Sequence, residues 1–102
     1  MRDFEPGDQT AAVGFYGAVL DPQAKAILDY LIDHPDERVD GPTLARTLGL
    51  PDNRLVARST YQMGLVASAH DRKRPWTEAQ LGYLMPGPIA ELFRRAQQTP
   101  DS

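Results

Sequence analysis

The clearest pattern of hydrophobic and polar positions in the chain begins at Asp21. Asp21 is a good N-cap, and Pro22 suits the first position of a helix, where its missing N–H is no loss. Apolar residues then recur with the i, i+3, i+4, i+7, i+8 spacing of a core-facing helix. They are Ala24, Ile27, Leu28, Leu31 and Ile32. His34 closes this predicted helix and Pro35 ends it.

A weaker helical pattern precedes it. Asp8 can cap a helix, and Gly14 and Gly17 would each weaken that helix by about 1 kcal/mol relative to alanine. Such a helix needs packing to survive. The residues that fall near one face of it are Ala12, Tyr16, Val19 and Leu20.

A second pair of helices is predicted beyond a short strand at Val39. Asp40 or Gly41 can cap the first of them, and Gly49 is placed as the left-handed residue that stops it. Its inward residues are Leu44, Ala45 and Leu48, after Pro42 at the first position. The turn of residues 50–53 then leads into a long helix from about Asn53 to His70.

The rest of the chain predicts a hairpin and a last helix. Trp76 belongs to the first strand and anchors the core, residues 83–85 form the second strand, and residues 78–80, which begin with Glu78, form the tip. Gly87 and Pro88 begin a helix with the apolar stripe Ile89, Leu92, Phe93 and Ala96.

The polar, proline-containing ends of the chain, residues 1–7 and 98–102, are expected to be flexible. One domain is therefore expected over residues 8–97, in agreement with a length of 102 residues.

The order helix, strand, helix, turn, long helix, hairpin, helix resembles the winged helix-turn-helix fold. The segment LARTLGLPDNRLVAR carries this resemblance, because a short helix ends in Leu-Gly-Leu and a second helix follows with a valine one turn in. More loosely, HPDERVDGPTLARTLGL, RPW and GYLMPGPIAELFRRA resemble a family of small actinobacterial winged-helix domains of unknown function. The resemblance implies a mainly α (α+β) fold with a short β-hairpin wing and extra N- and C-terminal helices.

In such a fold the helix over residues 53–70 is the recognition helix, whose exposed first half enters the major groove of DNA. A rotation of 100° per residue turns Val56, Thr60, Met63, Ala67 and His70 inward, with Ser59 beside them. It turns Arg54, Arg58, Tyr61 and Leu65 outward, with Gln62 at the margin. Arg54, Arg58 and Gln62 suit base contacts. The candidates for phosphate contacts are Arg46, Asn53, Tyr61, Ser68, Arg72, Lys73 and Arg74.

Charge supports this interpretation. The chain has a net charge of −3, yet residues 46–74 hold six basic residues against two acidic ones, whereas residues 1–45 hold three basic against nine acidic. Positive charge therefore gathers around the one helix that the fold would present to DNA. The alternative is an ordinary solvated surface, on which Arg54 and Arg58 at i, i+4 repel slightly.

Three features favour a protein partner instead of DNA. The tip of the predicted hairpin carries Glu78, so a basic wing in the minor groove is not supported. Tyr61 and Leu65 put apolar groups on the outer face, where they more often mark a protein contact. The overall acidity also weakens attraction to DNA. The second hypothesis is therefore a winged-helix interaction module, an adaptor or assembly subunit, that binds an acidic partner without direct DNA contact.

A homodimer through the N- and C-terminal helices is also expected, because AAVGFYGAVL holds more apolar residues than one stripe needs. The alternative is that both helices complete the core of the monomer. A further hypothesis is an adaptor whose N-terminal helix docks on another protein.

Enzymatic, metal and cofactor functions find no support in the sequence. The chain has no cysteine, and His34 and His70 each stand at a helix end without acidic residues at metal-ligand spacing. Asp29 and Asp33 are expected on a solvated helix face. Ser59 and Ser68 lie in no nucleophile motif, and Gly14-x-x-Gly17 lacks the lysine and strand of a phosphate loop. No apolar run could cross a membrane and no signal peptide is evident, so a cytoplasmic protein of the nucleoid is expected.

Overall fold

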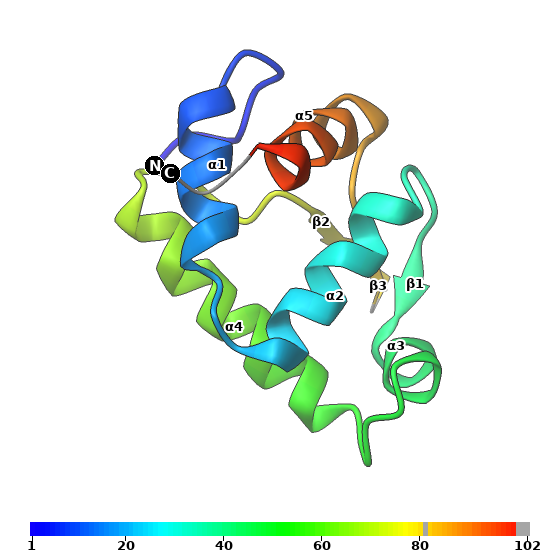
Figure 1. Ribbon diagram of the computed structural model, residues 1–102. Helices are drawn as coiled ribbons and strands as arrows, with labels where there is room; N and C mark the ends of the chain where they lie inside the picture. The colour runs from blue at the N-terminus through cyan, green and yellow to red at the C-terminus, as the bar shows by residue number, and fades with distance from the viewer. Residues whose placement is uncertain (81, 100–102) are drawn as a thin grey trace.

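This computed structural model describes residues 1–80 and 82–99. Within them the chain forms five helices and a small sheet (Figure 1). The result confirms the mainly α, α+β class, and the order of elements is compatible with a winged helix. In chain order the elements are α1 (Gln9–Ala18), α2 (Pro22–Asp33), β1 (Val39–Asp40), α3 (Gly41–Thr47), α4 (Arg54–Ala69), β2 (Thr77–Ala79), β3 (Gly82–Leu84) and α5 (Gly87–Gln98).

The described sheet is antiparallel, with the strand order β1-β3-β2. Val39 of β1 pairs with Tyr83 in the central strand β3. On the other side of β3, Thr77 pairs with Leu84 and Glu78 pairs with Tyr83. The hairpin is tighter than predicted, because Trp76 precedes β2 and Glu78 pairs within it instead of forming the tip. The turn includes Gln80, which has a φ of 50°, and residue 81, which lies outside the described residues.

Helix α2 has the predicted inner face and the predicted cap. Its five expected core residues are all buried, and the Asp21 carboxylate accepts a hydrogen bond from the Ala24 N–H at 2.9 Å. Asp40 caps α3 in the same way, accepting from the Thr43 N–H at 2.8 Å, and Gly49 has the expected positive φ of 70°. The predicted caps of α2 and α3 and the predicted left-handed glycine after α3 are therefore found in the structure.

Replacing Asp21 by alanine is expected to lower the free energy of unfolding by about 1 kcal/mol, because the Ala24 N–H loses its acceptor. Urea titration followed by far-UV circular dichroism measures the change. Gln23→Ala, at an exposed position in the same turn, is the matched control and should change the free energy of unfolding by less than about 0.5 kcal/mol. Equal effects of the two substitutions would contradict the capping role.

The N-terminal segment, residues 1–8, packs against the domain, which corrects the expectation that residues 1–7 are flexible. Phe4 is buried and lies between Phe15 and Phe93, with ring centroids 5.6 and 5.1 Å away. The Lys73 N–H donates to the Arg2 carbonyl at 2.8 Å. An aromatic residue that fits between two helices binds this segment to the core despite its polar surroundings in the sequence. At the other end Gln98 belongs to α5, and residues 100–102 lie outside the described residues.

Helices α1 and α5 pack against each other and complete the core of the monomer (Figure 1). Phe15 of α1 and Phe93 of α5 are fully buried, with ring centroids 5.7 Å apart. Leu20, expected to face inward, is instead 83% exposed, because α1 ends at Ala18 and the chain turns toward α2. The apolar excess that suggested a dimer through these helices is thus mostly used inside one chain.

Candidate nucleic-acid interface

Helix α4 turns the predicted residues inward and outward. Val56, Ser59 and Thr60 are buried together with Met63 and Ala67, so the expected inner face is confirmed. The side chain of Asn53 does not cap the helix; the Arg54 N–H instead donates to the Asp52 carboxylate at 2.8 Å. The helix runs from its start beside α3 along one flank of the molecule to the N-terminal segment (Figure 1).

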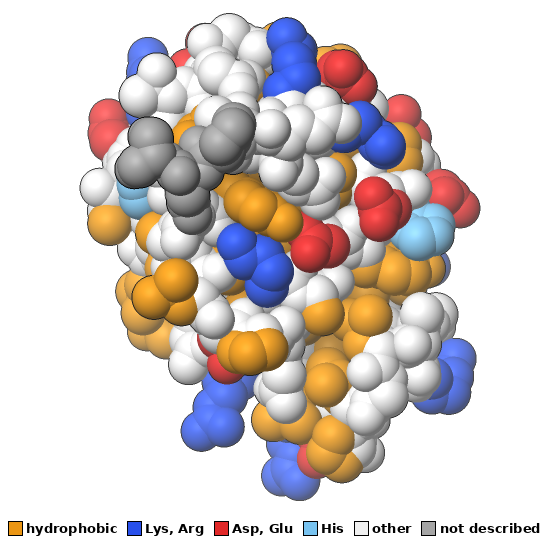
Figure 2. Space-filling view, viewed as in Figure 1, with side chains coloured by type: hydrophobic (Ala, Val, Ile, Leu, Met, Phe, Trp, Pro, Cys, Tyr) orange, Lys and Arg blue, Asp and Glu red, His pale blue; other side chains and the backbone are white. Residues whose placement is uncertain are grey.

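Three arginines, Arg46, Arg54 and Arg58, are exposed on α3 and the first turns of α4; we call them the α3/α4 arginine cluster. The Arg54 side chain is 90% exposed, and its Nη2 lies 3.3 Å from Asp52 Oδ2. The Arg54 N–H and then its guanidinium lower the pKa of the Asp52 carboxyl, so Asp52 offsets part of the positive charge. Figure 2 shows Lys and Arg side chains projecting at the end of the molecule where α3 and the start of α4 lie. Asn53 and Gln62 are exposed nearby.

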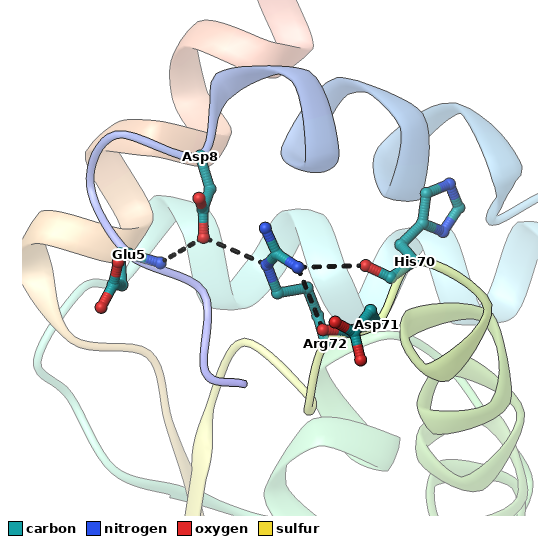
Figure 3. Close-up of polar contacts among 5 residues, drawn as sticks. All are labelled: Glu5, Asp8, His70, Asp71 and Arg72. Atoms are coloured by element: carbon teal, nitrogen blue, oxygen red, sulfur yellow. Dashed lines mark hydrogen bonds and ion pairs between the residues drawn. The ribbon is translucent and has the colours of Figure 1, made fainter. Parts of the chain in front are cut away.

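The Arg72 side chain is engaged within the chain, which corrects the expectation that it is available to contact phosphate. Its side chain is only 10% exposed, and its Nε lies 3.1 Å from Asp8 Oδ2 (Figure 3). Its Nη1 donates to the carbonyls of His70 and Asp71 at 3.2 and 3.0 Å, beyond the end of α4. The guanidinium therefore joins the N-terminal segment to the end of α4 and does not point to solvent.

Arg74 is also engaged within the chain. Its Nε donates to the Thr60 carbonyl at 3.1 Å, and its Nη1 lies 3.5 Å from Glu78 Oε2. The guanidinium covers Gly64, where an added Cβ would lie 2.7 Å from Nε. Arg74 thus fixes the hairpin against α4, and of the three basic residues in this link Lys73 is exposed, Arg74 is half-buried and Arg72 is buried.

A cleft of about 610 Å³ separates the start of α4 from the hairpin. Arg38, which the sequence reasoning missed, lies along it and donates from Nη1 to the Gln80 carbonyl at 3.1 Å. The cleft also contains Asp40 and Glu78. Hydrogen bonds from the Thr43 side chain and then the Thr43 N–H lower the pKa of Asp40, which keeps this carboxylate charged. The mixed charge gives the cleft no preference for phosphate.

A second hollow, of about 430 Å³, lies beside the C-terminal half of α4, and we call it the α4 groove. Tyr61 and Leu65 line it and are 59% and 57% exposed, as predicted for the outer face. Met1 lines it too, a contribution that sequence spacing could not indicate because it depends on the docked N-terminal segment. The residues around the groove are Met1, Asp3, Tyr61, Gly64, Leu65, Ser68, Arg72, Lys73, Arg74, Trp76 and Glu78.

The histidines both bond to helix carbonyls. The Nδ1 of His34 is 2.8 Å from the Tyr30 carbonyl, and that of His70 is 3.1 Å from the Val66 carbonyl. Asp29 is half-buried rather than solvated, because the Tyr16 hydroxyl donates to it at 2.7 Å. Burial, followed by this hydrogen bond to Asp29, raises the pKa of Tyr16 to about 12. Within residues 1–80 and 82–99 no three acidic or histidine side chains converge as metal ligands would.

The chain belongs to a family of unknown function (DUF6416), whose profile matches residues 9–100. Neither the curated proteins nor the solved structures compared with it gave a significant match. Among the helices of the described residues, none combines the length and the apolar character needed to cross a membrane.

Proposed function

We propose that this protein is a winged helix-turn-helix protein of the cytoplasm that binds double-stranded DNA, as a transcriptional regulator or a nucleoid-associated factor. The observation that carries the proposal is the α3/α4 arginine cluster. Arg54 and Arg58 stand one turn apart on the exposed start of α4, with Arg46 on the preceding helix. This is the part of a recognition helix that contacts base edges in the major groove.

Not all of the residues proposed from the sequence are exposed, so fewer side chains are available to contact DNA. Arg54, Arg58 and Gln62 are exposed and can reach base edges, where an arginine that bonds guanine twice contributes about 1–3 kcal/mol of discrimination. We assign the phosphate contacts to Arg46, Asn53 and Lys73, and Tyr61 lies at the edge of the outer face of α4. Arg72 is withdrawn, and Arg74 contributes only the part of its charge that Glu78 leaves. With so few cations, binding should be moderate and sensitive to salt.

Fluorescence anisotropy with a mixed pool of labelled duplexes tests the proposal. We expect binding at low salt that weakens at physiological salt, and a 10- to 100-fold loss of affinity in the Arg54→Ala/Arg58→Ala variant, which corresponds to about 1.4–2.8 kcal/mol. Both positions are exposed, so the variant should fold normally.

The matched control is Arg94→Ala/Arg95→Ala, which removes the same charge from exposed positions on α5. The affinity of this variant for DNA should lie within about twofold of that of the parent chain. Its two lost charges do not contact DNA and act only through a long-range electrostatic field that salt screens. No binding at low salt, or an equal loss in the two double variants, would refute the assignment of α4 as the recognition helix.

A further inference from the structure

The exposed apolar side chains of this protein are not scattered. In the part of the chain that the structure describes, four large hydrophobic residues are exposed, and three of them, Met1, Tyr61 and Leu65, line the α4 groove. The fourth, Leu20, lies just beyond α1 and does not line this groove. Apolar residues that gather around one hollow mark a contact with another macromolecule more often than isolated ones do.

The charges around the α4 groove indicate what kind of partner it fits. Asp3 and Glu78 oppose Lys73 and Arg74, so these four side chains carry no net charge. Arg72 also lines the groove, and Asp8 neutralises its charge. A rim of this kind offers an acidic peptide no net electrostatic attraction. It fits a surface that is itself apolar at the centre and carries both signs at its edge.

We propose that this partner is a second copy of the chain, bound across a two-fold axis with the two α4 helices antiparallel. They cross between residues 64 and 65, on the side of the exposed Leu65, because Arg74 covers Gly64. The same patch then serves both subunits, as an isologous contact requires. Each Tyr61, which projects from the outer face, enters the hollow beside α4 of the partner subunit.

Counting outward along the helix from this crossing point, Tyr61 lies opposite Ser68 of the partner subunit, and Arg58 lies near the carboxyl end of the partner subunit's α4. Asp71 is exposed and follows the carboxyl end of α4, where the helix dipole also favours a cation. The pairing is therefore complementary in charge as well as in apolar surface. Because this contact uses Arg58 and Tyr61, which the proposed function places at the DNA face, the dimer and DNA would compete for these two side chains; Arg54 stays outside the contact.

Light scattering after gel filtration, over roughly 10 µM to 1 mM protein, tests the proposal. The small patch should give a weak dimer, so the average mass should rise from one chain toward two as concentration increases. Leu65→Asp and Tyr61→Asp should each weaken association at least tenfold. Leu20→Asp is the matched control, because it puts the same charge on the exposed apolar residue outside the groove, and it should leave the dimer unchanged.

A cross-linking experiment gives an answer even where a charged variant fails to fold. The chain has no cysteine, so Leu65→Cys introduces one thiol close to the proposed axis. Mild oxidation should convert this variant, but not Leu20→Cys, into a covalent dimer. A single-chain mass at every concentration would refute the dimer. Loss of the dimer in Leu20→Asp but not in Leu65→Asp would place the interface near α1 and α2 and refute the α4 contact.

Discussion

Replacing Phe4 by alanine is expected to lower the free energy of unfolding by about 3–4 kcal/mol, the largest effect of any single substitution considered for this protein. The Phe4 side chain is buried, and its ring packs edge-on against Phe93 with a tilted contact to Phe15. Alanine would leave a cavity between α1 and α5, and the two remaining rings could close it only in part. For a domain of this size such a loss is a large part of the total stability.

Urea titration followed by the fluorescence of Trp76, the single tryptophan, measures this effect. Trp76 and Phe4 line the same small hollow, so the signal also reports whether the N-terminal segment is docked. Glu5→Ala, at the next and exposed position, is the control and should change the free energy of unfolding by less than about 0.5 kcal/mol. A loss below about 1 kcal/mol for Phe4→Ala would mean that the segment is not part of the core.

The second large effect is expected from Arg72→Met, which keeps most of the side-chain length but removes the guanidinium. We expect a loss of about 3 kcal/mol, because Asp8 loses its ion pair and the carbonyls of His70 and Asp71 lose their donor. Asp8→Asn should cost less, since an amide still accepts one hydrogen bond. A double-mutant cycle isolates the pair, and a coupling energy near zero would contradict its structural role.

The same pair predicts how stability depends on pH. The hydrogen bond from Arg72, followed by that from the Glu5 N–H, lowers the pKa of Asp8 below its ordinary value of 3.8. The pair therefore stabilises the fold fully above that value, and its contribution falls as the pH drops through the lowered pKa of the folded state. Between pH 5 and pH 3, the parent chain should lose more stability than Asp8→Asn does. Parallel curves for the two proteins over that range would count against the pair.

Local patterns in the sequence predicted the helices and their faces well. The inner residues of α2 and α4, the cap at Asp21 and the left-handed Gly49 all depend on neighbours within a few positions, and all are found in the structure. Asp29 shows the limit of the same reasoning. Its helix position was predicted, but its burial depends on Tyr16 and on Gln97, 68 residues away.

The candidate site was predicted less completely, because exposure of a cation depends on distant partners. Arg46, Arg54 and Arg58 are exposed as expected, whereas Arg72 is bound by a residue 64 positions away. A run of basic residues in the sequence does not show which of them has an acidic partner in the fold. One signal was present in the N-terminal segment, where Phe4 stands between Asp3 and Glu5 and is followed by Pro6 and Gly7. An isolated aromatic residue of this kind suggests an anchor rather than a flexible end.

The docking of Phe4 also constrains the order in which the chain can mature on the ribosome. Phe4 is synthesised before all five helices, and Phe93, its closest aromatic neighbour, belongs to the last of them. Helices α2 and α4 can pack as soon as residue 69 has emerged, because their contact is already complete by then. The N-terminal segment, in contrast, has to wait for α5. Until α5 has emerged, the Phe4 ring lacks its closest aromatic neighbour, and the core between α1 and α5 cannot close.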